Sequence, residues 1–302
     1  MNPISPLKGV YPILGTCFQD DERIDYESQE RLIDFCIENG QHGLVTLANA
    51  SEGHLMSDEE KKELLSFVIR KVNGRIPVVV TVNHPSSSCA AAMARFAEAE
   101  GASAVMCMPP FFGRWRSGLG EIEAYFKTID DAVNIPMILQ DHQLSDIALP
   151  SDFIISLATK LEHLKYVKLE FGNIIDKARK LLAHPQYALE GVFGGNSGVF
   201  LPEEYEAGCR GTMPACYMPD EFRKTWDLLE TGKTKEAVDF FTPYSRLAAY
   251  EKDVANRCLW KEILMKKGII KSAKIRGPQP AFFNNWSVNQ LLQVAQYAGV
   301  KF

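Results

Sequence analysis

The sequence predicts an α/β fold, a (β/α)₈ TIM barrel with a small C-terminal helical appendage. Apolar strand-like segments alternate with helical ones eight times between residues 9 and 215, which predicts a parallel sheet closed into a barrel. A doubly wound open sheet is the rival, but its phosphate-binding Gly-x-Gly-x-x-Gly is absent after the first strand. Strand signals stop after Pro219, so we expect a barrel over residues 1–232 and a helical subdomain over residues 233–302.

The predicted strands are short, apolar segments that end in turn or loop residues. They comprise residues 9–18, 43–48, 76–82, 102–108, 135–139, 164–173, 188–193 and 211–215. Apolar residues at helical spacing predict the intervening helices over residues 28–39, 86–100, 122–133, 174–183 and 202–207, with two more beginning near Ser57 and Ser151. Residues 57–60 have the sequence of a capping box. The final helices are predicted over residues 221–231, 234–249, 254–267 and 287–298, and the first of these completes the barrel.

Composition and charge argue against several classes of partner. The 302 residues are 46% hydrophobic and 24% charged, with a net charge of −5, which is typical of a globular protein without the basic stripe of a nucleic-acid binder. The longest basic cluster, residues 266–276, is interrupted by apolar residues and is typical of a loop after a helix. No apolar run approaches the ~20 residues of a membrane helix, and the first residues lack a signal-peptide layout. We therefore expect a cytoplasmic protein that does not enter a membrane.

The cysteines and histidines predict neither disulfides nor a metal site. Seven cysteines are scattered without a Cys-x-x-Cys pair, which in a chain of this length indicates reduced, mostly buried thiols. The six histidines form no pair or Cys/His cluster at ligand spacing. We therefore expect no bound metal.

Residues 164–173 place a lysine and a glutamate on one face of a strand. Side chains alternate along a strand, so Tyr166, Lys168 and Glu170 share one face and Val167 and Leu169 the other. In a barrel mouth, such an amine can attack a ketone and such a carboxylate can move protons. A poorly hydrated mouth favours the neutral amine, whereas the neighbouring carboxylate favours the ammonium. The alternative is a plain edge strand with a solvated Lys/Glu pair.

Function in such barrels gathers at the carboxyl ends of the strands. The candidates there are Asn49, Ala50, Ser51 and His54 after the second strand, Gln140, Asp141 and His142 after the fifth, Lys168 and Glu170 on the sixth, and Gly195, Asn196 and Ser197 after the seventh. Phe111 and Phe112, after the fourth strand, are expected to pack the rim. For His54 and His142, a structural hydrogen-bonded role is as plausible as catalysis.

The glycine-rich residues 194–198 have two functional interpretations. Glycine-rich backbone after the seventh strand can bind phosphate in barrels. Alternatively, the glycines let the backbone approach a ligand while the Asn196 amide hydrogen-bonds a substrate hydroxyl. No lysine or arginine lies beside the segment, which favours the amide role.

With these motifs, the chain resembles the dihydrodipicolinate synthase/N-acetylneuraminate lyase superfamily of Schiff-base barrels. Residues 9–12 resemble its opening strand, residues 43–52 its Gly-Thr-Thr-Gly-Glu strand and loop, and residues 110–112 replace its Pro-Tyr-Tyr. Lys168 falls on the Schiff-base lysine. The resemblance covers residues 9 to about 300, and it implies a covalent imine through Lys168 with no separate cofactor, and a homotetramer.

The departures from the family pattern are informative about the reaction. Gln140 stands where the family's aldolases and synthases place a proton-relay tyrosine, and Asn49 and Phe112 replace the relay's threonine and second tyrosine. The family's glutamate directly follows the lysine, whereas here it lies one residue further, at Glu170. This pattern resembles the 2-keto-3-deoxy-L-arabinonate dehydratase branch.

That branch implies a role for each matching residue. Lys168 would form the imine, Glu170 would be the acid/base, and Asn196 would hydrogen-bond the substrate. Ala50 and Ser51 would hold the carboxylate of a 2-oxo acid through backbone and hydroxyl donors.

The chemistry favours the same branch. Retro-aldol cleavage needs a base on the C4 hydroxyl, which is the tyrosine's role, whereas elimination of water needs a base for the C3 proton and an acid for the leaving hydroxyl. One inward carboxylate can do both. We therefore predict a Schiff-base lyase that dehydrates a 2-keto-3-deoxy sugar acid to a 2-oxo semialdehyde.

Two alternatives remain. One is a class I aldolase that releases pyruvate, using water with Asp141 or His142, or a dihydrodipicolinate synthase-like condensing enzyme. The other is a non-catalytic 2-oxo acid binding protein, although burying an unused charge is costly.

Overall fold

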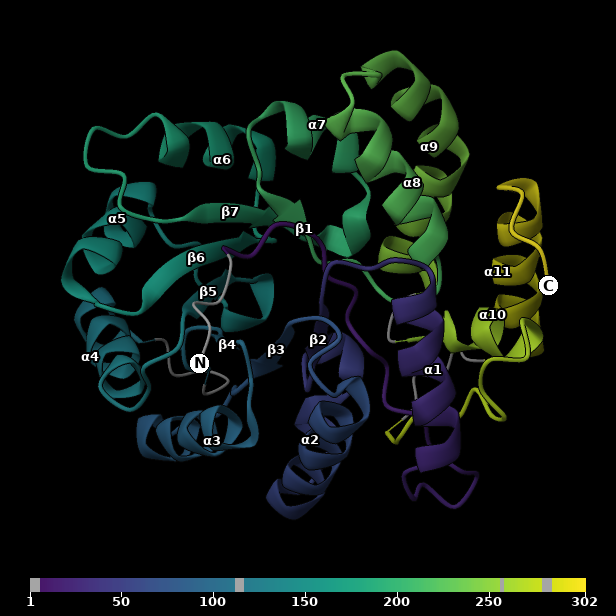
Figure 1. Cartoon of the computed structure of the whole chain (residues 1–302), viewed down its shortest axis with the longest axis horizontal. Helices are drawn as coiled ribbons and strands as arrows, with labels where there is room; N and C mark the ends of the chain where they lie inside the picture. The colour runs from purple at the N-terminus through teal and green to yellow at the C-terminus, as the bar shows by residue number, and fades with distance from the viewer. Residues whose placement is uncertain (1–5, 112–116, 256–257, 279–283) are drawn as a thin grey trace.

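The chain forms a barrel of eight parallel strands surrounded by helices (Figure 1). The computed structural model describes residues 6–111, 117–255, 258–278 and 284–302. Neighbouring strands follow the order β1-β8-β7-β6-β5-β4-β3-β2. The strands are β1 (Gly9–Val10), β2 (Leu44–Thr46), β3 (Val78–Thr81), β4 (Ala104–Cys107), β5 (Met137–Asp141), β6 (Leu164–Leu169), β7 (Gly191–Gly194) and β8 (Gly211–Thr212). The predicted barrel fold is confirmed.

Closure of the barrel depends on the chain just after β1. Ile13 forms parallel bridges with Val45 of β2 and with Ala215 beyond β8. Strands β1 and β8 are shorter than predicted because Pro12 and Pro214 have no N–H to donate to a ladder. Their carbonyls still accept hydrogen bonds, from Val45 N at 3.0 Å and Ile13 N at 2.7 Å, so that pairing continues past each proline.

Side-chain alternation along β6 agrees with the prediction. Tyr166 belongs to the apolar cluster inside the barrel, whereas Val167 and Leu169 belong to the cluster between the sheet and the helices. The Tyr166 hydroxyl donates to Glu190 at 2.5 Å and accepts from Leu7 N at 2.9 Å. Lys168 and Tyr166 thus share the inner face of the strand.

Eight helices within the described residues cover the outside of the barrel. They are α1 (Tyr26–Glu38), α2 (Asp58–Val72), α3 (Ser87–Glu100), α4 (Leu119–Asp130), α5 (Ser151–Lys160), α6 (Ile174–Leu182), α7 (Leu201–Glu206) and α8 (Pro219–Glu230). The predicted capping box opens α2: Glu60 N donates to Ser57 Oγ, and Ser57 N donates to the Glu60 carboxylate. No helix among the described residues is long and apolar enough to cross a membrane.

Further helices follow the barrel at the C-terminal end. They are α9 (Thr234–Tyr250), one turn of π-helix, η5 (Glu251–Ala255), then α10 (Lys261–Lys266) and α11 (Asn285–Tyr297). The prediction of one helix over residues 254–267 is wrong, because Cys258 has a left-handed backbone (φ 65°) that no α-helix continues through. Residues 256 and 257 of that prediction lie outside the described part. The domain boundary at residue 232 stays a prediction.

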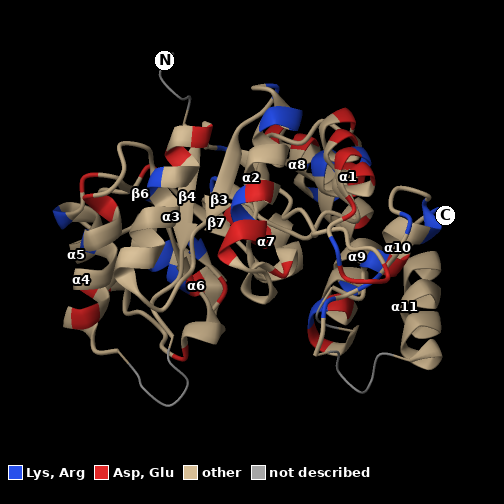
Figure 2. Cartoon of the chain, turned by 90° about the horizontal axis from the view of Figure 1, so that it is seen from below, with Lys and Arg blue, Asp and Glu red and all other residues tan. Residues whose placement is uncertain are grey.

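Buried charges tie this C-terminal region to the loop that follows β2. Lys261, with 1% of its side chain exposed, forms an ion pair with the equally buried Glu52, and the other Glu52 oxygen accepts from Arg276 N at 2.8 Å. The Arg276 guanidinium pairs with Glu60 at 2.7 Å and lies over the ring of Phe18. The basic cluster predicted as a loop does follow α10, and acidic side chains of the barrel neutralise part of it. Figure 2 shows acidic and basic residues interspersed over the visible helices.

Substituting Lys261 by methionine should test this connection. Removing the ammonium leaves the Glu52 carboxylate buried without its cation, so the free energy of unfolding should fall by about 3–5 kcal/mol. Urea unfolding measures the change. The exposed Lys266 on the same helix is the control, and Lys266→Met should change stability by less than about 0.5 kcal/mol. The double variant Lys261→Met/Glu52→Gln should recover part of the loss; no recovery would contradict the ion-pair account.

Candidate active site

Three predicted residues meet at the carboxyl ends of β5 and β6. Lys168 is 1% exposed, and its Nζ lies 3.1 Å from Oε2 of Glu170. Gln140, the neighbour of Lys168 in the strand register, donates its Nε2–H to the same oxygen at 2.6 Å. Strand β6 lies between β5 and β7, so the alternative of an edge strand with a solvated pair is wrong.

The loop after β7 closes over the other side of Glu170. Oε1 of Glu170 accepts a hydrogen bond from the main-chain N–H of Asn196 at 3.3 Å. A Cβ at Gly195 would lie 2.2 Å from Cγ of Glu170, so only glycine leaves room for this side chain. The predicted backbone approach at Gly195 therefore occurs toward Glu170. A contact between the Asn196 amide and a substrate stays a prediction.

The electrostatic balance keeps Glu170 ionised. Burial alone would raise the pKa of this carboxyl, but the charge of Lys168, with smaller effects from His142 and the Gln140 hydrogen bond, lowers the pKa to about 2. Burial also lowers the pKa of His142, so its imidazole is neutral at neutral pH. His142 Nδ1 accepts from Leu144 N at 3.0 Å, which is the structural role considered for this residue.

Asp141 is a predicted site residue whose side chain the structure places away from the Lys168 cluster. It follows Gln140 by one position on β5, so its side chain points to the opposite face of the strand. There its fully buried carboxylate pairs with Lys177 Nζ at 2.5 Å and accepts from Leu149 N at 3.2 Å. Asp141 therefore lies outside the Lys168 cluster, and we omit it from the proposed site.

The loop after β2 forms one turn of 3₁₀-helix, η1 (Asn49–Ser51). Ser51 N donates to Ala48 O at 3.0 Å, and Ser51 O accepts from the Thr16 hydroxyl at 2.5 Å. The backbone N–H of Ser51 is thus already hydrogen-bonded inside the turn. It is not free to bind a substrate carboxylate, as the expected backbone donors at this loop would require. The buried hydroxyl of Ser51 and Oε1 of Gln140 have no hydrogen-bond partner among the described residues, which is uncommon for buried polar atoms.

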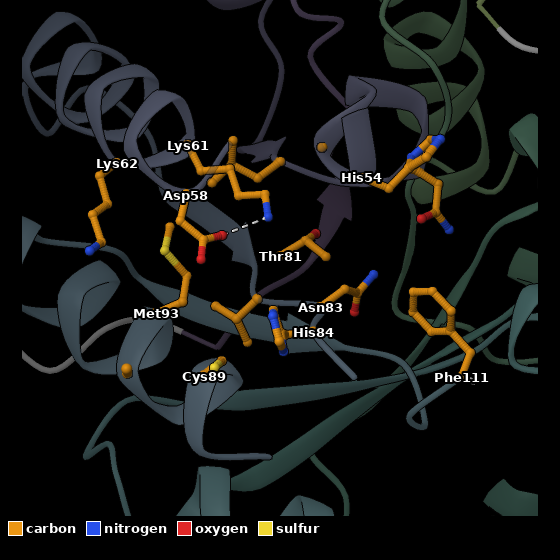
Figure 3. Close-up of a pocket in the computed structure, with 15 residues that line it drawn as sticks. His54, Asp58, Lys61, Lys62, Thr81, Asn83, His84, Cys89, Met93 and Phe111 are labelled. Carbon is orange, nitrogen blue, oxygen red and sulfur yellow. Dashed lines mark hydrogen bonds and ion pairs between the residues drawn. The ribbon is translucent and has the colours of Figure 1, made fainter. Parts of the chain in front are cut away.

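A cavity of about 160 Å³ lies beside the ends of β2, β3 and β4 (Figure 3). The predicted residues Asn49 and His54 line it, together with Phe111, whereas Lys168 and Glu170 do not. Thr81 and Asn83 also line it and were not predicted, although the rule that function gathers at strand ends, applied to the third strand, would have found them. Phe112, which was expected to pack the rim, lies outside the described residues.

The C-terminal region also reaches the predicted binding loops. The Ser197 hydroxyl donates to Glu251 Oε2 at 2.9 Å, and the Cys258 thiol donates to Ala50 O at 3.3 Å. The sequence predicted only a helical appendage here and gave no sign of either contact, because residues so far apart in the chain leave no local pattern.

A second buried carboxyl, Glu204, lies behind β7. A Cβ at Gly194 would fall 1.7 Å from its Oε2, so Glu204 occupies the space that this glycine leaves free, as Glu170 does at Gly195. Burial raises the pKa of Glu204 to about 8; the nearby Thr212 hydroxyl opposes the rise and the charge of Glu170 adds to it. Neither Glu204 oxygen has a hydrogen bond of good geometry among the described residues. Glu204 is therefore mainly protonated at neutral pH.

Glu204 should make stability depend on pH. Its pKa is about 8 when folded and near 4.5 when unfolded, so the folded state binds more protons between these values and the free energy of unfolding falls as pH rises through this window. Glu204→Gln lacks this titration, so its stability relative to the parent protein should increase from pH 5 to pH 8. Urea unfolding at several pH values measures it. The exposed neighbour Glu203 is the matched control, and a pH-independent difference for Glu204→Gln would contradict the assignment.

The fold and this cluster define a class, the (β/α)₈ barrel protein with a buried lysine–glutamate pair at its strand ends. The profile of the dihydrodipicolinate synthetase family matches residues 6–286. The chain belongs to this family, whose members are lyases, as the sequence predicted.

Individual relatives carry different activities. The chain is 31% identical over 274 residues to L-2-keto-3-deoxyarabonate dehydratase from Azospirillum brasilense, covering 90% of this chain and 89% of that protein. It is 28% identical over 240 residues to 4-hydroxy-tetrahydrodipicolinate synthase from Methanococcus aeolicus, covering 76% and 78%. The crystal structure of dihydrodipicolinate synthase from Rhodopseudomonas palustris superposes with a TM-score of 0.89 at 25% identity, covering 97% of this chain and 98% of that one.

Proposed function

We propose that the protein is a hydro-lyase that dehydrates a 2-keto-3-deoxy sugar acid through an imine on Lys168. The observation that carries the proposal is the buried Lys168–Glu170 pair, whose carboxylate also accepts a hydrogen bond from Gln140. By the family resemblance, Gln140 stands where an aldolase would have its relay tyrosine. The similarity to a 2-keto-3-deoxyarabonate dehydratase supports the substrate class. The imine makes a separate cofactor unnecessary.

Imine formation begins with a proton transfer inside the pair. The Lys168 ammonium gives a proton to Glu170, 3.1 Å away, and the neutral amine attacks C2 of the 2-oxo acid. The resulting carbinolamine hydroxyl takes the proton from Glu170 and leaves as water. The product is an iminium with Glu170 ionised again.

Elimination then uses the same carboxylate twice. The iminium acidifies C3, Glu170 removes a C3 proton to give an enamine, and the protonated Glu170 donates to the C4 hydroxyl, which leaves as water. A proton shift and hydrolysis of the imine release the semialdehyde and regenerate Lys168.

We propose that the loop after β2 binds the substrate carboxylate and that the loop after β7 binds the substrate hydroxyls. The unpartnered buried hydroxyl of Ser51 is a donor for the carboxylate, beside the N–H of Ala50. The Asn196 amide is assigned to a substrate hydroxyl. An aldolase is the less favoured function, because Asp141, one of the two groups available to replace the tyrosine, pairs with Lys177 on the far face of β5.

Borohydride trapping should identify the imine. Reduction in the presence of pyruvate should add a stable adduct to Lys168, because an imine is reduced to a secondary amine, and peptide mass spectrometry locates it. Lys168→Ala should abolish the adduct, while Lys165→Ala on the same strand should retain it. An unlabelled Lys168 would exclude the proposed reaction.

Glu170→Gln should separate imine formation on Lys168 from the elimination of water. The amide keeps the shape of the side chain but cannot move protons, so dehydration should slow by about 10²–10⁴-fold, while prolonged trapping with pyruvate still labels Lys168. The measurement is semialdehyde formation from 2-keto-3-deoxy sugar acids. Release of pyruvate by the parent protein would instead establish the aldolase.

A further inference from the structure

Glu251 is a buried carboxyl outside the barrel that contacts the loop after β7. It begins the turn of π-helix η5, is 5% exposed, and accepts the hydrogen bond from Ser197 Oγ at 2.9 Å. Burying a carboxyl is costly unless it is hydrogen-bonded, so the bond from Ser197 offsets part of the cost of burying Glu251. Turns of π-helix occur frequently at functional sites.

The loop that Glu251 contacts has an unfavourable backbone. Asn196, Ser197 and Gly198 all have left-handed conformations, with φ of 50°, 56° and 71°. Two of them carry side chains, and such conformations persist only where surrounding contacts hold them. The main-chain bonds of the loop, Gly198 N to Gly195 O and Val199 N to Asn196 O, are local. The Ser197 side chain supplies an anchor to a separate part of the chain.

The same loop also holds the proposed base. Asn196, directly before Ser197, donates its N–H to Glu170 Oε1 at 3.3 Å, which is near the long limit for a hydrogen bond. A small displacement of the loop would therefore break this bond and free Glu170 on one side.

We propose that Glu251 is a positioning residue for the catalytic carboxylate. Through Ser197 it fixes the left-handed loop, and through the Asn196 N–H the loop fixes Glu170 in front of Lys168. The inference rests on the proposed function, since it concerns the geometry of the same base. The Cys258–Ala50 contact shows that this C-terminal segment also touches the loop after β2.

A double-mutant cycle between Glu251 and Ser197 tests the proposal. Glu251→Leu and Ser197→Ala should each lower kcat for dehydration by about 10- to 100-fold, because small misplacement of a catalytic group is costly, with little change in KM. The double variant should be no slower than either single variant, since both remove one interaction. Additive losses, or unchanged kcat in both single variants, would overturn the proposal.

A conservative variant and a neighbouring control complete the design. Glu251→Gln keeps an oxygen that can accept from Ser197 and should retain kcat within about threefold of the parent, whereas a loss as large as that of Glu251→Leu would overturn the proposal. The exposed Asp253 lies on the same turn, and Asp253→Asn should have no effect. Should Glu251→Leu fail to fold, Ser197→Ala and Glu251→Gln still give opposite expected results.

Trapping with pyruvate separates this inference from the proposed function. If Lys168 of the parent protein forms no adduct, the imine mechanism fails, and the inference fails with it. If the parent protein forms the adduct and dehydrates its substrate while the Glu251 and Ser197 variants keep full kcat, the inference alone is wrong. The expected result is that these variants still form the adduct on prolonged trapping, while their kcat for dehydration falls.

Discussion

The site depends on one interaction, the ion pair between Lys168 and Glu170 inside the barrel mouth. Removing two charges from water costs more than their attraction returns unless further hydrogen bonds satisfy the remaining lone pairs. Here Gln140 and the Asn196 N–H supply those bonds to the two Glu170 oxygens, and Gly195 supplies the space. Each of these features serves the carboxylate, and the carboxylate in turn gives the lysine a proton acceptor at hydrogen-bond distance.

The contrast between Glu170 and Glu204 illustrates the effect of that cation. Both carboxyls are buried, and both approach strand β7 through consecutive glycines, Gly194 and Gly195. Burial pushes both pKa values up, yet the pKa of Glu170 is about 2 and that of Glu204 about 8. The difference between the two pKa values follows mainly from Lys168, which faces Glu170 and has only a minor influence on Glu204; His142 and Gln140 add to the effect at Glu170. A protonated Glu204 also adds no negative charge that would compete with Glu170 for the ammonium.

Sequence patterns predicted the parts of the structure that depend on local periodicity. Alternation along β6 was sufficient to place Lys168 and Glu170 together, because a period of two holds wherever a strand is regular. Asp141 was included among the residues at strand ends because β5 was predicted to end at residue 139. The strand continues to Asp141, so alternation turns this side chain to the outer face. The left-handed Cys258 broke a predicted helix without a glycine to signal it.

Contacts between distant segments could not be predicted in this way. The Ser197–Glu251 and Ala50–Cys258 hydrogen bonds join residues 54 and 208 positions apart. Neither end of either contact has a spacing or composition that points to the other. Only the folded chain brings them together.

These long-range contacts change how the C-terminal region is understood. The barrel strands fix Lys168 and Gln140 through the sheet, but the loops after β2 and β7 have no sheet to hold them. The first is held by the buried Glu52–Lys261 pair and by Cys258, and the second by Glu251. A boundary at residue 232 therefore describes the order of elements along the chain and not the limits of the site. Loops that position ligands need rigid support, and for these two candidate binding loops part of that support comes from the region beyond the barrel.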